Sequence, residues 1–276
     1  MAQTVLITGC SSGIGHATAE HLAQRGFTVY ATARRVESIE DLKAKGCRTL
    51  ALDVIDEDSA RAAVRTVESE QDAIDVLVNN AGYGRSGAIE TIPLDEVRRQ
   101  FETNVFGYLR MAQLVLPGMR ERRSGRVVNI SSVAGKVTMP GSGVYSASKF
   151  AIEAMSDALR FELSGFGVHV VLVQPGPIRT QFTAGANETL SGDGDASPYA
   201  DFHAAVAKAD AEGDQSRLAG DPEDVAKVVE RAIRARRPKA RYTVTPLARI
   251  APGIRAVLSD RSWDAFLRAQ VKPPGA

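Results

Sequence analysis

Cysteine is scarce in this sequence, whose 276 residues include only Cys10 and Cys47. That count excludes a disulfide framework, and neither the cysteines nor the four histidines have metal-site spacing, so no metal is expected. An excess of one charge is also lacking, because 34 basic and 33 acidic side chains leave a formal net charge of +1. The chain therefore has no bulk electrostatic attraction for nucleic acid or an anionic membrane. No apolar run approaches the roughly 20 residues of a membrane span, and no signal peptide is evident, which predicts a cytoplasmic protein.

Short apolar runs alternate with longer segments of helical periodicity through most of the chain. Runs rich in Val, Ile and Leu, with few polar interruptions, are typical of strands buried on both faces. Repeated strand–helix alternation predicts an α/β fold, a doubly wound, Rossmann-type parallel sheet flanked by helices. The expected strands are residues 4–8, 28–33, 49–52, 74–79, 126–130 and 168–174, and the expected helices are 14–25, 36–45, 57–70, 94–122 and 144–166.

The regular alternation ends after Gln174. Residues 183–198 are rich in Gly and Asp and predict a mobile loop of the kind that often forms a lid. One or two short helices are expected over residues 198–217, and Asp221 with Pro222 forms a typical helix start. A last strand is expected at residues 242–245, followed by helix over residues 250–270.

A glycine-rich turn follows the first expected strand, where residues 8–15 read Thr-Gly-Cys-Ser-Ser-Gly-Ile-Gly. Gly9 and Gly13 permit a close backbone approach, and Gly15 permits tight packing of the next helix on the sheet. The free N–H groups of such a turn bind the phosphates of a dinucleotide. The alternative is an ordinary glycine-rich turn, but the strand–turn–helix context favours the phosphate-binding interpretation.

The end of the second expected strand indicates which dinucleotide is bound. An acidic residue there would bind the ribose 2′-hydroxyl of NAD, whereas arginine would bind the 2′-phosphate of NADP. This chain has Arg34 and Arg35 and no acid at the tip of the strand. We therefore expect NADP(H), with NAD(H) less favoured. Glu37 nearby keeps open the alternative that both arginines are simply solvated.

Tyr145 and Lys149 lie four residues apart near the start of an expected helix, and therefore on one face of it. A neighbouring ammonium would favour the phenolate and lower the tyrosine pKa from about 10 toward neutrality. Ser131 and Ser132 follow a strand at the edge of the sheet where ligands bind, and Asn104 lies within a helical segment that it does not favour. Each feature also has an ordinary explanation: a solvated helix pair, a turn or a helix cap.

Together these segments resemble the short-chain dehydrogenase/reductase family over about residues 4–180. The resemblance lies in the order and spacing of residues 8–15, 79–82, 104, 130–132, 145–149 and 175–176. It implies that Tyr145 is the general acid/base and that Lys149 tunes it. It also implies that Ser132 polarises a carbonyl and that Asn104 holds a water in a proton relay.

The resemblance also implies a set of residues that contact the dinucleotide. Asp53 would bond the adenine amine, residues 80–82 would lie beside the adenosine ribose, and the loop 175–180 would bind the carboxamide. The full expected set is Gly9, Ser11, Ser12, Gly13, Ile14, Gly15, Arg34, Arg35, Asp53, Val54, Asn80, Ala81, Gly82, Tyr145, Lys149, Pro175, Gly176, Ile178 and Thr180.

Residues 8–15, 29–35, 174–180 and 241–242 are also similar to the branch that contains hydroxysteroid and retinol dehydrogenases. That similarity implies a small-molecule partner, a ketone or aldehyde on an apolar, steroid-, retinoid- or lipid-like molecule. Ala147, Ala151, Ala154 and Ala158 recur at helical spacing and allow close packing within the chain or between subunits, and the family resemblance implies a homodimer or homotetramer that associates through this helix. The alternative from another class is a non-catalytic dinucleotide-binding sensor or scaffold on the same fold.

We expect one domain over residues 1–276. Residues 1–180 would form the cofactor-binding and catalytic core, 181–220 a substrate lid, and 221–276 the C-terminal helices and last strand. The role of the Gly- and Asp-rich stretch 184–198 is left open. Cys10 is expected to be exposed but not catalytic, and His203 is expected to pack within the lid.

Overall fold

The computed structural model describes residues 2–188, 190 and 197–275, and within them a parallel sheet of seven strands. The strands are β1 (Thr4–Ile7), β2 (Thr28–Ala33), β3 (Arg48–Ala51), β4 (Val76–Asn79), β5 (Gly125–Ile130), β6 (Val168–Gln174) and β7 (Arg241–Thr243). Their order is β3-β2-β1-β4-β5-β6-β7. Successive strands are therefore added on one side of β1 up to β3 and on its other side from β4 onward. The predicted doubly wound α/β fold is confirmed, with every pairing parallel.

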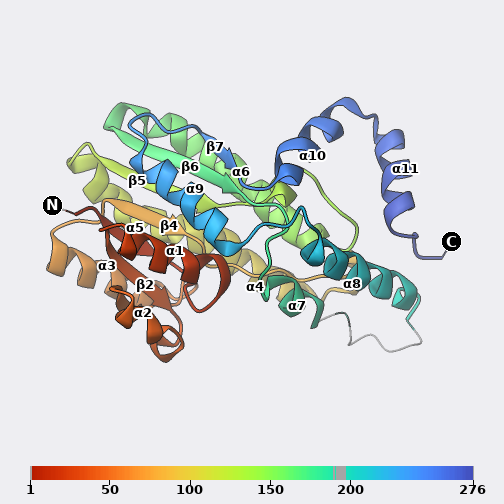
Figure 1. Ribbon diagram of the computed structural model, residues 1–276, viewed down its shortest axis with the longest axis horizontal. Coiled ribbons are helices and arrows are strands. Elements are labelled where there is room, and N and C mark those ends of the chain that lie inside the picture. Colours follow the sequence, from red (N-terminus) through yellow and green to blue (C-terminus); the bar gives the residue numbers. More distant parts are fainter. Residues whose placement is uncertain (1, 189, 191–196, 276) are drawn as a thin grey trace.

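Helices cover both faces of this sheet, and the C-terminal helices extend from it at one end (Figure 1). The α-helices are α1 (Gly13–Gln24), α2 (Asp41–Ala44), α3 (Glu57–Gln71), α4 (Leu94–Phe101), α5 (Gly107–Glu121), α6 (Gly143–Glu162), α7 (Phe182–Asn187), α8 (Ala200–Gln215), α9 (Pro222–Arg234), α10 (Pro246–Val257) and α11 (Asp260–Gln270). Shorter helical segments are η1 (Val36–Ile39), η2 (Ile89–Thr91), η3 (Glu102–Phe106), η4 (Val133–Gly135) and η5 (Ser164–Phe166).

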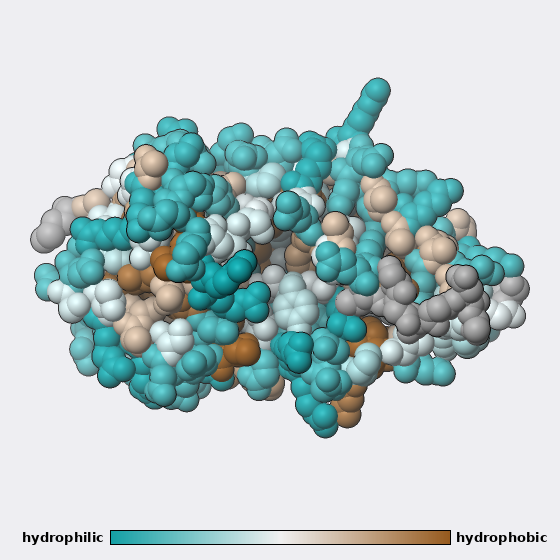
Figure 2. All heavy atoms as spheres, turned by 90° about the horizontal axis from the view of Figure 1, so that it is seen from below, coloured by the Kyte–Doolittle hydropathy of each residue, from teal (hydrophilic) through white to brown (hydrophobic). Residues whose placement is uncertain are grey.

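Side chains of successive strand residues enter two different cores. Val5 and Ile7 of β1 pack in a cluster with residues of α1 and α9, whereas Leu6 between them packs with residues of α3 and α5. This alternation explains why the strands are apolar almost throughout, since both faces are covered. The face drawn in Figure 2 is mostly hydrophilic, with small separate apolar patches.

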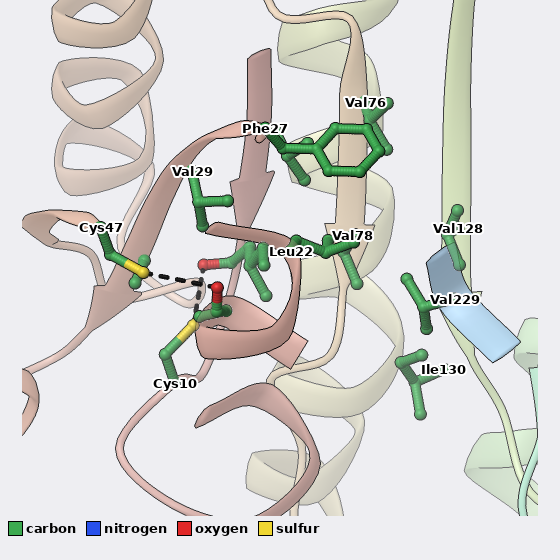
Figure 3. Close-up of a cluster of buried hydrophobic side chains, with 14 of the residues drawn as sticks. Cys10, Leu22, Phe27, Val29, Cys47, Val76, Val78, Val128, Ile130 and Val229 are labelled. Atoms are coloured by element: carbon green, nitrogen blue, oxygen red, sulfur yellow. Dashed lines mark hydrogen bonds between the residues drawn. The ribbon is translucent and has the colours of Figure 1, made fainter. Parts of the chain in front are cut away.

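Both cysteines belong to the first of these cores (Figure 3). Cys10 is fully buried, and its thiol contacts the backbone oxygen of Ile7 at 3.5 Å. Burial raises the pKa of the Cys10 thiol to about 12. The expectation that Cys10 is exposed was therefore wrong: the turn points its side chain into the core beneath α1.

Two of the expected helices are interrupted. Residues 36–45 form the short helices η1 and α2, and the expected helix 94–122 consists of α4, a π-helical segment η3 and α5. A π segment inserts an extra residue into the helical repeat and often occurs at functional sites. Here it contains Asn104, which is fully buried.

The region after β6 is more helical than expected. Helix α7 occupies part of the expected loop 183–198, while residues 189 and 191–196 of that loop lie outside the described residues. Residues 198–217 contain one helix, α8, and residues 250–270 are divided between α10 and α11. A bridge joins Ile178, just before the expected lid, to Gly220 at its end. Within the described residues, no helix has the length and apolarity needed to span a membrane.

His203 of α8 packs as expected. It is 4% exposed, its Nε2 accepts a hydrogen bond from the backbone N–H of Ala88 at 3.1 Å, and its ring lies beside those of Tyr199 and Phe202.

Candidate active site

The glycine-rich turn is fixed by contacts with the end of β4. The Thr8 hydroxyl accepts hydrogen bonds from the backbone N–H groups of Asn80 and Ala81 at 3.0 and 3.1 Å. The side-chain amide of Asn80 donates to the backbone oxygens of Thr8 and Gly9 at 3.0 and 2.8 Å. The predicted segments 8–15 and 80–82 therefore meet at the carboxyl edge of the sheet, where ligands bind in this fold class.

Glycine is required at two positions of this turn. Gly9 has φ +73°, and a Cβ on it would lie 2.6 Å from the Ala81 Cα. A Cβ on Gly15 would lie 2.2 Å from the Gly9 carbonyl oxygen. Both distances are well inside van der Waals contact, so the turn can hold this shape only without side chains.

The turn leaves the first N–H groups of α1 available to an anion. Ser12 occupies the N-cap position, but its side chain makes no capping hydrogen bond, and both Ser11 and Ser12 are exposed. The N-terminus of a helix attracts negative charge through its free donors and its dipole. These residues fit a dinucleotide pyrophosphate. Thr180 lies opposite the turn, since a Cβ on Gly13 would be 3.3 Å from its methyl carbon.

Arg34 and Arg35 follow β2 directly, and both are exposed. Their guanidinium groups carry the positive charge that a ribose 2′-phosphate needs. Asp53 and Val54 follow β3, where Val54 is buried and the Asp53 carboxylate accepts a hydrogen bond from the N–H of Ile55 at 3.1 Å. The four residues border the same edge of the sheet as the glycine turn.

Ser132, Tyr145 and Lys149 come together after β5. Ser132 caps η4 by accepting a hydrogen bond from the Ala134 N–H at 3.0 Å, and its hydroxyl also hydrogen-bonds the Tyr145 phenol. The Lys149 ammonium is buried, lies 5.7 Å from the Tyr145 ring centroid and donates to the Ile130 carbonyl at 2.8 Å. Two of the three side chains thus come from one face of α6, as their spacing predicts.

The sequence predicted a lowered pKa for Tyr145, but the surroundings in the structure raise it. Burial raises the pKa of Tyr145 to about 12, although the hydrogen bond from Ser132 opposes this change. Burial also lowers the pKa of Lys149 to about 8, against the attraction of the Glu153 carboxylate. The surroundings provided by the chain therefore favour the neutral form of both groups, which sequence spacing alone does not reveal.

Asn104 lies against the same helix. Its side-chain amide donates to the Ser148 hydroxyl at 3.1 Å and to the Tyr83 carbonyl at 2.9 Å, and its oxygen accepts from the Tyr83 N–H at 3.1 Å. Ser148 immediately precedes Lys149, so the π segment connects the loop after β4 to α6. Asn104 therefore lies beside the residue that precedes Lys149, and its place in the site and its water relay stay predictions.

The loop at residues 175–180 borders the site from β6. The Pro175 carbonyl accepts from the N–H of Val133, next to Ser132, at 2.7 Å. At the far end of the loop, Arg179 pairs with Asp221 at 2.8 Å. Gly176 and Ile178 lie between these two anchors, and Thr180 faces the glycine turn. The loop therefore contacts both the serine turn and the proposed phosphate site.

Three neighbours of the site were missed in the sequence. Tyr108 of α5 donates to the Ile130 carbonyl at 3.1 Å, and the Phe182 ring of α7 lies 5.2 Å from that of Tyr145. Their remote positions in sequence give no local signal. Glu153 is buried one turn beyond Lys149, and its spacing of four residues was a signal that could have been used.

The fold and the turn are those of a doubly wound dinucleotide-binding protein. A model of the short chain dehydrogenase family matches residues 3–191, so the chain belongs to this family of oxidoreductases. The chain is 39% identical to the human 17-beta-hydroxysteroid dehydrogenase type 1 over 98% of this chain and 85% of that protein. It is 36% identical to the NADPH-dependent 3-dehydrocapnine reductase of Ornithobacterium rhinotracheale, covering 97% and 96% of the two chains. The solved structure of a short-chain dehydrogenase from Streptomyces avermitilis has a TM-score of 0.79 at 34% identity, over 97% of both chains.

Proposed function

We propose that this protein is an NADP(H)-dependent oxidoreductase that interconverts a ketone or aldehyde and its alcohol. The observation that carries the proposal is the convergence of Ser132, Tyr145 and Lys149 beside a phosphate-binding turn. The nicotinamide ring supplies the hydride when bound. The hydroxyls of Ser132 and Tyr145 donate to the substrate oxygen, and Tyr145 transfers the proton. The Lys149 ammonium stabilises the phenolate that remains.

The choice of NADP(H) rests on charge. Arg34 and Arg35 are exposed at the end of β2, and no acid stands at its tip. The NADPH-dependent relative supports the same choice. Residues 1–180 would form the cofactor-binding and catalytic core, and residues 181–220 the lid over the substrate. The bridge between Ile178 and Gly220 ties the end of that segment to the loop at residues 175–180.

An apolar substrate is favoured by a cavity of about 690 Å³ whose lining includes Gly143, the first residue of the helix that carries Tyr145. It lies between the segment 136–143, which leads from η4 to α6, and helices α8 and α11. Its aromatic lining residues are Phe150, Tyr199, Phe202 and Trp263.

The charged groups at this cavity already have partners. Glu90 accepts from the Tyr199 hydroxyl at 2.7 Å, Lys136 pairs with Glu153 at 3.1 Å, and Arg255 pairs with Asp260 at 2.5 Å. An uncharged steroid-, retinoid- or lipid-like group is therefore the best match, in keeping with the hydroxysteroid relative.

We further propose a homodimer or homotetramer in the cytoplasm. Ala147, Ala154 and Ala158 are exposed along α6 together with Phe161, which leaves an apolar helix face open to a second subunit.

The test is NADPH and NADH consumption across a panel of ketones and aldehydes, with Tyr145→Phe beside the wild type. Tyr242→Phe is the matched control, because this tyrosine lies on β7 and its hydroxyl accepts a hydrogen bond from the Lys239 N–H at 3.1 Å, away from Ser132 and Lys149. We expect NADPH-dependent turnover that is lost in Tyr145→Phe and kept in Tyr242→Phe, with NADPH affinity unchanged in both. Tight NADPH binding without turnover in the wild type would favour the alternative of a dinucleotide sensor. Full activity of Tyr145→Phe would refute the assigned acid/base.

A further inference from the structure

Glu153 of α6 is a buried carboxylate with an unusual number of partners. It is 3% exposed. Its Oε1 accepts from the Ser131 hydroxyl at 2.7 Å and from the Gln174 amide at 2.8 Å. Its Oε2 accepts from Arg241 Nε at 2.8 Å and lies 3.1 Å from the Lys136 ammonium. A buried charge is tolerated only when it is paired and hydrogen-bonded, and this one satisfies that condition.

These partners come from different parts of the sheet edge. Ser131 follows β5 and precedes Ser132, Gln174 ends β6 and precedes the loop 175–180, and Arg241 begins β7. One carboxylate therefore fixes the positions of the serine turn and of the loop on its other side. The packing around it is tight, because a Cβ on Gly135 would lie 2.9 Å from the Glu153 Cγ.

The same carboxylate is also an electrostatic neighbour of Lys149, which lies four residues earlier on the same face of α6. Among the described residues, the rings of Tyr108 and Tyr145 lie 5.3 and 5.7 Å from the ammonium, and the Ile130 carbonyl accepts its hydrogen bond. None of these carries a full charge when the tyrosines are protonated. Glu153 is thus the acid that offsets the cost of burying the ammonium, and its attraction raises the pKa of Lys149.

We propose that Glu153 is a positioning residue for the site: it holds Ser131 and Gln174 in place and supplies the negative charge that keeps Lys149 in its ammonium form. The expected change in kcat/KM rests on the proposed function, whereas the expected change in the Lys149 titration does not. Lys136 and Arg241 share the charge of Glu153, so changing either cation changes the field at Lys149. Asp157 binds the other side of Arg241, at 2.6 Å, without contacting Ser131 or Gln174.

The sign of the effect follows from the charges. Replacing the carboxylate with a neutral amide, Glu153→Gln, removes negative potential and lowers the pKa of both Lys149 and Tyr145. Carbonyl reduction needs both groups protonated. The alkaline limb of the pH profile of kcat/KM therefore moves to lower pH, whichever of the two groups titrates first. Lys136→Gln removes a cation that screens the carboxylate and should move both values upward. Opposite shifts from two substitutions would not follow from a loss of packing.

The experiment measures the Lys149 titration directly by NMR in protein labelled with 13C-lysine, with Lys149→Arg for assignment. The pH profile of kcat/KM for NADPH-dependent reduction is recorded on the same proteins. We expect Glu153→Gln to lower both by roughly half to one pH unit, and Lys136→Gln to raise both by a smaller amount. Asp157→Asn is the matched control, and its shift should be the smallest of the three.

Equal shifts in Glu153→Gln and Asp157→Asn, or no change of the Lys149 titration in either Glu153→Gln or Lys136→Gln, would overturn the proposal. If Glu153→Gln does not fold, the upward shift in Lys136→Gln decides. The NMR measurement does not depend on turnover, so a protein without reductase activity would refute the proposed function while the titration still tests the role of Glu153.

Discussion

Lys149→Met should make the protein more stable at neutral pH while abolishing turnover. The Lys149 side chain is 4% exposed among the rings of Tyr108 and Tyr145, and burial lowers its pKa from the ordinary 10.5 to about 8. At pH 7 the folded protein therefore holds a charge that its surroundings disfavour. Methionine has a similar length and no charge, so it keeps the packing and removes this cost.

The magnitude follows from the pKa values. A fall from 10.5 to about 8 corresponds to roughly 3 kcal/mol, at about 1.4 kcal/mol for each pKa unit. The substitution also removes the Nζ hydrogen bond to the Ile130 carbonyl, worth about 1 kcal/mol. That carbonyl still accepts from the Tyr108 hydroxyl. The net gain at pH 7 is about 2 kcal/mol, or a rise in Tm of roughly 4–8 °C.

The assay is thermal unfolding between pH 6 and pH 10.5. Because the folded pKa of Lys149 lies below the unfolded one, the unfolded chain binds more protons between pH 8 and 10.5, and wild-type stability rises with pH in that window. Lys149→Met loses this rise, so the two curves cross below pH 10.5, and above the crossing the wild type is the more stable protein because it keeps the Nζ hydrogen bond to Ile130. Tyr145 acts with the opposite sign in both proteins: its raised pKa stabilises the folded state below pH 10, and this is lost toward pH 12. Lys208→Met, 79% exposed on α8, is the control and should change Tm little. A Lys149→Met variant that melts below the wild type at pH 7, with an unchanged slope above pH 8, would refute the reasoning.

Further substitutions test the turn, the cofactor choice and the cavity. Gly15→Ala should lower Tm and weaken NADPH binding in fluorescence titrations, because its Cβ would meet the Gly9 carbonyl at 2.2 Å; overpacking of this kind costs about 1–3 kcal/mol. Gly213→Ala in α8 is the control: its Cβ would meet nothing within 4 Å, so the substitution should raise stability slightly. A fall in Tm as large as that of Gly15→Ala would contradict the steric argument. Arg34→Asp should reduce the preference for NADPH over NADH by roughly ten- to a hundredfold in kcat/KM, and an unchanged ratio would place the 2′-phosphate elsewhere. Trp263→Ala, which enlarges the apolar cavity, should improve kcat/KM for bulkier apolar ketones relative to small ones; equal effects on both would exclude the cavity from substrate binding.

Features that depend on residues close together in the sequence were predictable from it. The strands are recognisable because burial on both faces demands continuous apolar side chains, as in β1 and β6. The glycine turn is recognisable because Gly9 and Gly15 face backbone atoms at distances that no side chain allows. The helical position of Tyr145 and Lys149 followed from their spacing alone.

Features that depend on packing between remote segments were not predictable. The periodicity of residues 94–122 fits one helix, yet a π segment forms around Asn104, whose side chain bonds Tyr83 and Ser148 from two other segments. Cys10 lies in an apparently open turn but points into the core beneath α1. In each case the partner that decides the outcome lies far away in the sequence.

The electrostatics of the Tyr145–Lys149 pair is decided in the same way. A lysine four residues away stabilises a phenolate only while the lysine itself is charged, and burial by Tyr108 and Phe182 opposes charge on both groups. The four-residue spacing therefore identifies the pair but does not by itself lower the pKa of Tyr145. A buried acid must offset that desolvation, and Glu153 occupies the next turn of the same helix face with its charge held by Ser131 and Gln174. Tyr145, Lys149 and Glu153 thus lie at successive turns of α6, and the role we propose for Glu153 is to raise the pKa of Lys149 against the desolvation that lowers it.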